Sequence, residues 1–189
     1  DNVDLNIKQG EFFALLGHNG AGKSTAVRML TTLLKPSDGS AKVSGYDVAT
    51  EANMVRKNIG VALQDAAIDP LMTGNELLKL QAVLHGIPRQ EGRARCAELL
   101  ERVGLTAAGD KRVGTYSGGM RRRLDLALSL VHRPKVLFLD EPTTGLDPQA
   151  KRNLWNLVKD LNSSGMTIVL TTHNMEEAEY LCDRIAIMD

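Results

Sequence analysis

Short apolar runs alternate with amphipathic stretches along most of the chain. Residues 12–16 are wholly apolar, as expected for a strand buried on both faces, and apolar side chains then recur at helical spacing as far as Lys35-Pro36. Strands are predicted at residues 2–7, 11–16, 41–44, 58–63, 136–139, 167–170 and 185–188. Because strands alternate with helices, the pattern indicates an α/β fold with a mainly parallel sheet and helices on both faces.

The middle of the chain, residues 67–130, changes to helical periodicity. Thr73, followed three residues later by Glu76, is a capping-box signature, in which each residue satisfies a backbone N–H near the other. Helices are predicted from Thr73, over about 89–103, from about Ser117, after Asp147-Pro148 and after Asn174 with Glu177. We therefore expect one domain with a core, residues 1–66 and 131–189, and a helical subdomain, residues 67–130.

Composition and charge narrow the classes of function. The chain has 189 residues, of which 43% are hydrophobic and 24% charged, and these values exclude a disordered tail. The 23 Lys and Arg residues balance 23 Asp and Glu residues, so no nucleic-acid partner is expected from bulk charge. Cys96 and Cys182 form neither a disulfide framework nor a metal-site spacing, which favours a reducing compartment. No stretch approaches the length of a transmembrane span.

The two ends of the sequence suggest a fragment. The first residue is Asp1 rather than Met, and the last segment stops inside an expected strand. We therefore expect both ends to have been trimmed from a longer chain.

A phosphate-binding loop follows the first buried strand. The segment Gly17-His18-Asn19-Gly20-Ala21-Gly22-Lys23-Ser24, with Thr25 after it, fits the pattern G-x-x-x-x-G-K-[ST] between a strand and an amphipathic helix. Glycines allow the backbone N–H groups to surround phosphate oxygens, and the helix N-terminus adds its positive dipole end. Lys23 is expected to contact the β- and γ-phosphates, and the Ser24 hydroxyl to ligate Mg²⁺. The sequence thus predicts binding of a nucleotide with Mg²⁺.

Two carboxylates end the buried strand at 136–139. Asp140 is expected beside the phosphate loop, where it would hold Mg²⁺, and Glu141 is expected to polarise the attacking water. Together with the loop they predict nucleotide hydrolysis rather than binding alone. His173 follows another strand end, and by itself such a histidine is either structural or catalytic. His18, His85 and His132 are interpreted as ordinary surface or loop histidines.

At this point the motifs resemble those of the ATP-binding cassette (ABC) ATPases of membrane transporters. Ser117-Gly118-Gly119 with Met120 resembles the signature motif of that family, usually written LSGGQ, and Gln64 matches its Q-loop glutamine. Asp147 matches the D-loop aspartate, and His173 the switch histidine. The resemblance implies a P-loop NTPase (RecA-like) core, an N-terminal antiparallel β portion and an inserted α-helical subdomain. It also implies that Gln64 contacts Mg²⁺ and links the nucleotide to the helical subdomain.

The resemblance further implies a head-to-tail dimer. Two ATP molecules would lie between the phosphate loop of one domain and Ser117, Gly118, Gly119 and Met120 of the other, with Asp147 at the interface. The second ABC ATPase domain would be identical or homologous, and a transmembrane permease subunit or domain would hold the pair at the cytoplasmic face of the membrane. The aromatic residue that stacks on adenine in the family has no counterpart here, because Phe12 and Phe13 lie inside a strand.

The assignment to a branch of the family depends on fewer residues, those around the signature motif. Tyr116-Ser117-Gly118-Gly119-Met120, followed by Arg121-Arg122-Arg123, resembles the drug-resistance exporters that include daunorubicin-resistance ATPases. The arginine run is equally readable as a solvated helix face. The main expectation is an exporter of drug or lipid-like cargo. The alternatives are an ABC-type ATPase that acts on ribosomes or DNA without a membrane partner, and a regulatory cassette that does not hydrolyse ATP.

Overall fold

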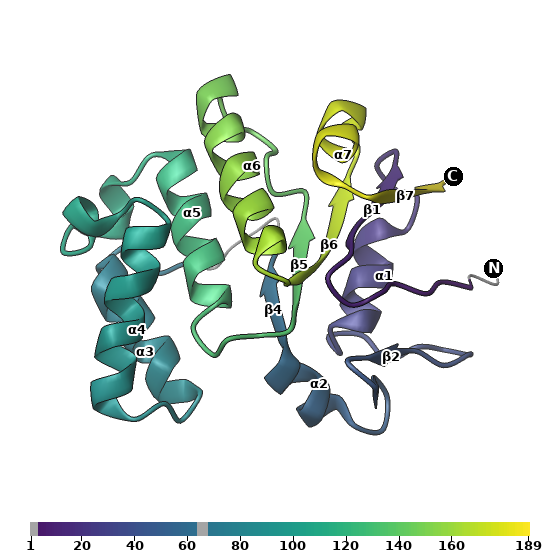
Figure 1. Ribbon diagram of the computed structural model, residues 1–189, viewed down its shortest axis with the longest axis horizontal. Coiled ribbons are helices and arrows are strands. Elements are labelled where there is room, and N and C mark those ends of the chain that lie inside the picture. The colour runs from purple at the N-terminus through teal and green to yellow at the C-terminus, as the bar shows by residue number, and fades with distance from the viewer. Residues whose placement is uncertain (1–3, 64–67) are drawn as a thin grey trace.

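A five-stranded parallel sheet forms the centre of the molecule (Figure 1). The structure is a computed structural model that describes residues 4–63 and 68–189. The strand order is β4-β5-β6-β1-β7, and every pairing is parallel. The strands are β1 (Phe12–Gly17), β4 (Ile59–Ala62), β5 (Val136–Asp140), β6 (Thr167–Thr172) and β7 (Arg184–Met188). The predicted α/β architecture is confirmed.

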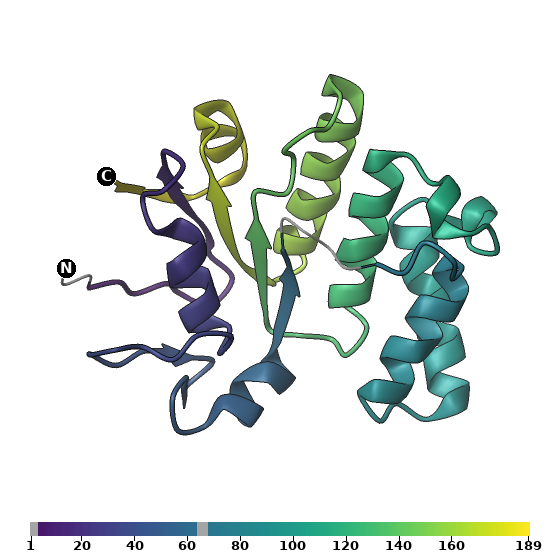
Figure 2. The same ribbon diagram turned by 180° about the vertical axis from the view of Figure 1, so that it is seen from behind.

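Apolar side chains leave the sheet on both faces, which explains the unbroken apolar runs. In β1, Phe12, Ala14 and Leu16 enter one buried cluster, whereas Phe13 and Leu15 enter the other. The first face is covered by α6 (Pro148–Ser163) and α7 (Met175–Leu181), and the opposite face by α1 (Lys23–Leu30) and α2 (Ala52–Asn58) (Figure 2). Each face therefore buries its own aliphatic core.

The antiparallel portion is smaller than the sequence suggested. It consists of β2 (Lys42–Val43) and β3 (Tyr46–Asp47). The prediction of a strand at residues 2–7 is wrong for its described part, since residues 4–8 lie outside any helix or strand. β1 already pairs with β6 on one side and β7 on the other, so it offers no free edge to that segment.

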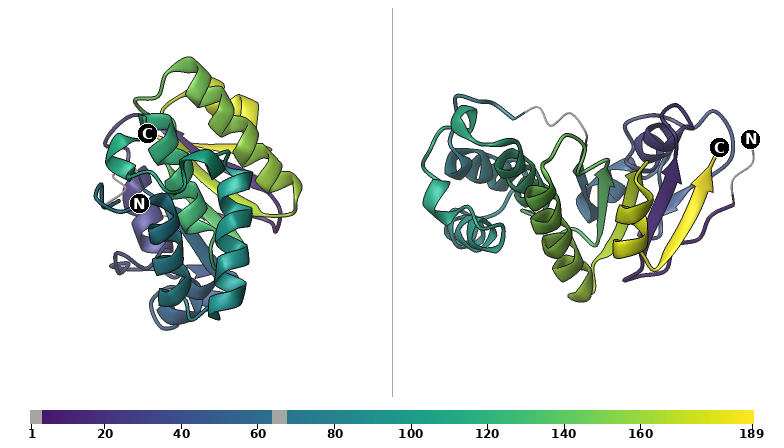
Figure 3. Two further views of the ribbon diagram at one scale, coloured as in Figure 1. Left: turned by 90° about the vertical axis from the view of Figure 1, so that its left-hand side faces the viewer. Right: turned by 90° about the horizontal axis from the view of Figure 1, so that it is seen from above.

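Three helices gather at the β4 end of the sheet, away from α1 (Figure 3). They are α3 (Gly74–Leu84), α4 (Arg89–Arg102) and α5 (Gly118–Ser129), and the 3₁₀ turns Thr106–Ala108 and Val113–Thr115 lie between α4 and α5. The predicted capping box is present: Thr73 Oγ1 accepts from Glu76 N at 3.2 Å, and Glu76 Oε2 accepts from Thr73 N at 2.8 Å.

The predicted starts of the last two helices are confirmed by their caps. Asp147 Oδ1 accepts from the backbone N–H groups of Gln149 and Ala150, and Pro148 occupies the first position of α6. Asn174 Oδ1 likewise accepts from Glu177 N at the start of α7. The helix α1 is shorter than predicted, because Thr32 adopts a left-handed conformation (φ 64°) one turn before Pro36.

Candidate functional site

Parallel register brings the predicted site residues to one edge of the sheet. Leu16 of β1 lies opposite Thr172 of β6, and Asp140 of β5 lies opposite Thr171. The segments that leave these three strands therefore meet at their carboxyl ends, where open α/β sheets bind ligands. The phosphate loop, the Asp140–Glu141 pair and His173 occupy that edge.

The phosphate loop depends on glycine at three positions. Gly20 and Gly22 have φ values of 94° and 97°, in the left-handed region that favours glycine. A Cβ at Gly17 would lie 2.3 Å from the carbonyl oxygen of Met188, so the approach of β7 excludes any larger residue there. No side chain in the described part of the chain caps the start of α1, which leaves the helix N-terminus directed into the loop.

Lys23 is buried inside this loop. Its Nζ donates to the carbonyl oxygens of Gly17 at 2.7 Å and His18 at 3.0 Å, and lies 3.6 Å from Glu141 Oε1. Its side chain is 4% exposed. A buried ammonium group needs such partners to offset its lost hydration. The lysine is thus already held in the loop, with its charge directed at the carboxylate of Glu141.

Asp140 joins the loop to the sheet. Its Oδ1 accepts from the hydroxyl of Ser24 at 3.2 Å and from the hydroxyl of Thr171. The Ser24 hydroxyl and the Asp140 carboxylate are the hard oxygen ligands that Mg²⁺ takes alongside phosphate and water. Within residues 4–63 and 68–189, no cluster of three or more His, Cys, Asp or Glu residues forms an all-protein metal site. The residues present therefore fit Mg²⁺ that arrives with a nucleotide.

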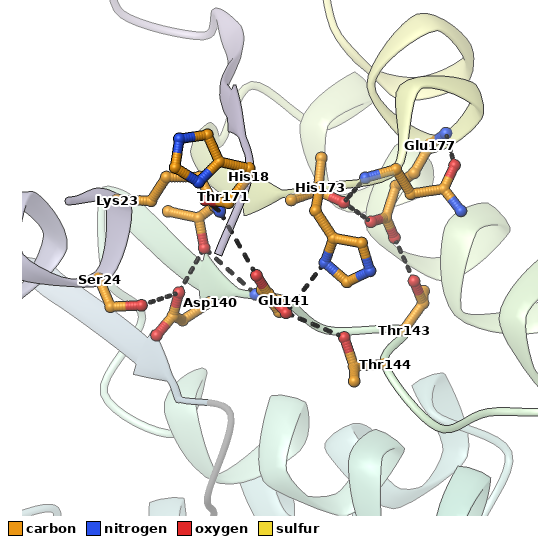
Figure 4. A network of polar contacts seen from close by, with 12 residues as sticks. His18, Lys23, Ser24, Asp140, Glu141, Thr143, Thr144, Thr171, His173 and Glu177 are labelled. Atoms are coloured by element: carbon orange, nitrogen blue, oxygen red, sulfur yellow. Dashed lines mark hydrogen bonds and ion pairs between the residues drawn. The ribbon is translucent and has the colours of Figure 1, made fainter. Parts of the chain in front are cut away.

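Glu141 stands at the centre of the polar network (Figure 4). One carboxylate oxygen, Oε1, faces Lys23, whereas Oε2 lies 3.2 Å from His173 Nδ1 and accepts from Thr144 Oγ1 at 3.2 Å. The backbone of Glu141 is left-handed (φ 47°), a conformation that costs a non-glycine residue about 1–3 kcal/mol. The site thus holds a buried carboxylate between two cationic or ionisable groups on a strained turn.

The segment Ser117–Met120 lies apart from this cluster. Exposed Ser117 caps α5, where its Oγ accepts from Met120 N at 3.2 Å. A Cβ at Gly119 would lie 2.9 Å from Ala150 Cβ, so glycine allows α5 and α6 to pack closely. In Figures 1 and 3, α5 and α1 lie on opposite sides of β5 and α6. The structure therefore does not bring the signature residues of this chain to its own phosphate loop.

A comparison with protein families settles the class of protein. The family model described as ABC transporter matches residues 1–144. The chain belongs to the ABC transporter family. It is 49% identical over 189 residues to the daunorubicin/doxorubicin resistance ATP-binding protein DrrA of Streptomyces peucetius. The aligned region covers 100% of this chain and 57% of that protein. The chain thus spans less than two thirds of the length of this relative.

Two solved structures share the fold of this ABC ATPase domain. One is the dimeric structure of a post-hydrolysis state of the ATP-binding cassette MJ0796 bound to ADP and Pi; its TM-score is 0.88 at 30% identity, covering 100% of this chain and 85% of that one. The other is cbiO1 from Clostridium perfringens, part of the ABC transporter complex cbiONQ. Its TM-score is 0.90 at 33% sequence identity, and the match covers 99% of this chain and 76% of that chain. The fold predicted from the ABC resemblance is therefore confirmed.

Sequence reasoning missed the central role of Glu177 in this ABC domain. Its carboxylate is buried and accepts from Thr143 Oγ1 at 2.8 Å, Trp155 Nε1 at 2.9 Å and Thr172 Oγ1 at 2.6 Å. These donors lie next to the Glu141 turn, on α6 and just before His173. The one available signal was an acidic residue directly before Ala178 on α7, but the Asn174–Glu177 spacing indicated only the start of a helix.

The structure bears on three other predictions, which concern Gln64, the two phenylalanines of β1 and the arginine run of α5. Gln64 lies outside the described residues, so its proposed contacts stay a prediction. Phe12 and Phe13 are fully buried, one in each of the two core clusters of the sheet. The interpretation of the arginine run as a solvated face is wrong for Arg122, whose side chain is 10% exposed.

Among residues 4–63 and 68–189, the helices are all too short or too polar to cross a membrane. The longest, α6, has 16 residues and carries charged side chains on its outer face.

Proposed function

We propose that this chain is the ATP-hydrolysing motor domain of an ABC exporter. The observation that carries the proposal is the carboxylate of Glu141, buried between Lys23 and His173 beside the Ser24–Asp140 pair. A base for water, a cation for phosphate and a pair of hard oxygens for Mg²⁺ are the parts that phosphoryl transfer to water requires. Drug or lipid-like cargo is proposed from the relative named for daunorubicin and doxorubicin resistance.

The chemistry follows from the positions of these groups. Glu141 accepts a proton from the attacking water as the new oxygen–phosphorus bond forms, and the bond between the γ-phosphorus and the bridging oxygen breaks to release ADP. Lys23 and the loop N–H groups bind the phosphates, with Gly17, Asn19, Gly20, Ala21, Gly22, Ser24 and Thr25 lining the loop. Ser24, Asp140 and Gln64 would hold Mg²⁺, which would supply charge neutralisation at the phosphates. His173 orients the carboxylate and the γ-phosphate.

We propose that the active site is completed by a second domain. The dimeric MJ0796 structure with ADP and Pi supports this arrangement by similarity. Ser117, Gly118, Gly119 and Met120 would contact nucleotide on the partner domain, which explains their position away from the phosphate loop of this chain. Asp147 would lie at the interface. In this proposal residues 67–130 act as the signature subdomain of a core formed by residues 1–66 and 131–189.

A transmembrane permease is the proposed second partner. The similarity to cbiO1, part of the transporter complex cbiONQ, supports it, and it would place this domain at the cytoplasmic face of a membrane. The balanced charge of 23 basic and 23 acidic residues gives no basic surplus for a nucleic-acid partner. The intact Glu141–His173 pair favours a hydrolysing over a regulatory cassette.

The proposal is tested by ATP turnover of the full-length protein and its Glu141→Gln variant. Removing the base is expected to lower kcat by at least about a hundredfold, the scale of general-base catalysis, with the Kd for ATP unchanged within about threefold. Glu101→Gln, on the exposed side of α4, is the matched control and keeps wild-type turnover. Near-normal turnover of Glu141→Gln would remove Glu141 from the role of base.

A further inference from the structure

Arg122 makes a set of contacts that the proposed function does not use. It lies on α5, five residues after Ser117, and its side chain is 10% exposed. Its Nε donates to the carbonyl oxygen of Pro142 at 2.7 Å, and its Nη2 to that of Glu141 at 3.0 Å. Its Nη1 donates to the carbonyl oxygen of Leu63 at 2.7 Å. One guanidinium group thus binds three backbone carbonyls.

The three carbonyls belong to two distant parts of the chain. Leu63 follows β4 and directly precedes Gln64, whereas Glu141 and Pro142 follow β5. The rigid fork of an arginine can satisfy several acceptors in a fixed geometry, which a single lysine ammonium cannot reproduce. Arg122 therefore connects the segment and helix Ser117–Ser129 to the residues that directly follow β4 and β5.

The Glu141 peptide is held from two sides. Its N–H donates to the carbonyl oxygen of Thr171 at 3.0 Å, with the Thr171 hydroxyl at 3.2 Å, and its carbonyl accepts from Arg122. Glu141 has a left-handed backbone (φ 47°), a conformation that persists when surrounding contacts hold it. That backbone aims the carboxylate at His173 and Lys23, and the hydrogen bond from Arg122 is one of the contacts that hold it.

We propose that Arg122 is a positioning residue that couples the signature helix to Glu141. The inference rests on the proposed function, in which Ser117–Met120 of this chain bind nucleotide on the partner domain. Engagement of that nucleotide moves the start of α5, and Arg122 transmits the movement to the Glu141 peptide and to the carbonyl group of Leu63. Hydrolysis at one site thereby depends on occupancy of the other.

The neighbouring arginine supplies a matched control. Arg123 lies on the same helix and also donates to backbone carbonyls, those of Val103 at 2.7 Å and Gly104 at 3.3 Å, but these residues directly follow α4. Arg123→Met removes the same charge and the same kind of hydrogen bond without touching the Glu141 turn. A difference between Arg122→Met and Arg123→Met therefore reports the connection to Glu141.

The first test measures kcat and the Kd for ATP in the full-length protein, together with its transmembrane partner where turnover requires it. Arg122→Met is expected to lower kcat at least about tenfold with the Kd for ATP within about threefold of wild type. Arg122→Lys, which keeps one charged donor, is expected to recover part of kcat, and Arg123→Met to stay within about threefold. Arg122→Lys carries the test if Arg122→Met does not fold.

The second test places Arg122→Met, or Arg122→Lys if the former does not fold, in the Glu141→Gln background. If Arg122 acts through Glu141, it lowers single-turnover hydrolysis less than about twofold there. The inference is overturned if kcat of the Arg122 variants stays within threefold of wild type, or if kcat of Arg123→Met falls as far as that of Arg122→Met. It is also overturned if the fold-losses in rate of the Arg122 variant and of Glu141→Gln multiply in the double variant. Normal turnover of Glu141→Gln alone overturns the proposed function instead, so the two failures are distinguishable.

Discussion

Nδ1 of His173 lies 3.2 Å from Oε2 of Glu141, although the imidazole is 47% exposed and the carboxylate 9% exposed. The imidazole ring therefore lies between the buried carboxylate and solvent. The opposite oxygen, Oε1, faces Lys23 at 3.6 Å. In the proposed function a nucleotide phosphate bound by Lys23 would compete with Glu141 for the lysine, which would leave His173 and Thr144 as the partners of the carboxylate.

Replacing His173 by alanine is expected to impair hydrolysis more than folding. The half-exposed ring contributes little buried area, whereas its contact with Glu141 orients the base. We expect kcat to fall by about ten- to a hundredfold, with the melting temperature within about 2 °C of wild type. Steady-state turnover and thermal unfolding of the same preparation check the prediction.

The control for this variant is His85→Ala, because His85 stacks on His132 away from the Glu141 turn. That variant should keep kcat. If His173→Ala and wild type hydrolyse ATP at the same rate, His173 has no part in orienting the base.

The motifs of the site follow from the sequence, because each one combines a strand end with residue types that bind phosphate or metal. The convergence of Gly17, Asp140 and His173 also follows, since the carboxyl ends of parallel strands share one edge. What could not be predicted depends on tertiary packing. The burial of Arg122 and Glu177, and the lack of a strand within residues 4–11, are set by neighbours distant in sequence.

Glu177→Gln is expected to destabilise the domain, because three donors converge on this buried carboxylate. Thr143 and Trp155 share Oε1, whereas Thr172 donates to Oε2. An amide has only one acceptor oxygen, so at least one of these donors loses its acceptor. Each buried unsatisfied group costs about 1–3 kcal/mol, which predicts a fall in melting temperature of about 3–10 °C. Differential scanning calorimetry measures the change.

The adjacent Glu176 gives the matched control, since its side chain is 77% exposed and pairs only loosely with Lys151 at 3.6 Å. Glu176→Gln should leave the melting temperature within about 1 °C. Equal shifts for the two variants would show that the Glu177 hydrogen bonds do not stabilise the fold.

The raised pKa of Asp125 predicts that the free energy of unfolding depends on pH. Burial raises the pKa of Asp125 from 3.8 to about 6, and the charge of Arg122, with Nη1 3.7 Å from Oδ2, offsets only part of this effect. An acid with a raised folded pKa binds its proton more tightly when folded. Its stabilising contribution is therefore complete below about pH 4 and is lost as the pH rises through about 6, a change of about 3 kcal/mol.

The Asp125→Asn variant isolates this effect, because all other groups titrate alike in the two proteins. The free energy of unfolding of Asp125→Asn minus that of wild type should increase by about 3 kcal/mol between pH 4 and pH 8. Urea unfolding across this range measures the difference, with Asp160→Asn on the exposed side of α6 as control. A difference that stays constant with pH would contradict the raised pKa.

The most direct test of the account is the mass of full-length Glu141→Gln in solution, measured by light scattering with and without Mg-ATP. If Glu141 is the base, this variant binds ATP without hydrolysing it, and the proposed dimer would keep ATP between the phosphate loop of one domain and Ser117–Met120 of the other. The account predicts a shift from monomer to dimer on addition of Mg-ATP, and no shift when Ser117→Arg is added to the variant. An unchanged monomer mass, with ATP binding confirmed in the same sample, would contradict a nucleotide sandwich between two copies of this chain.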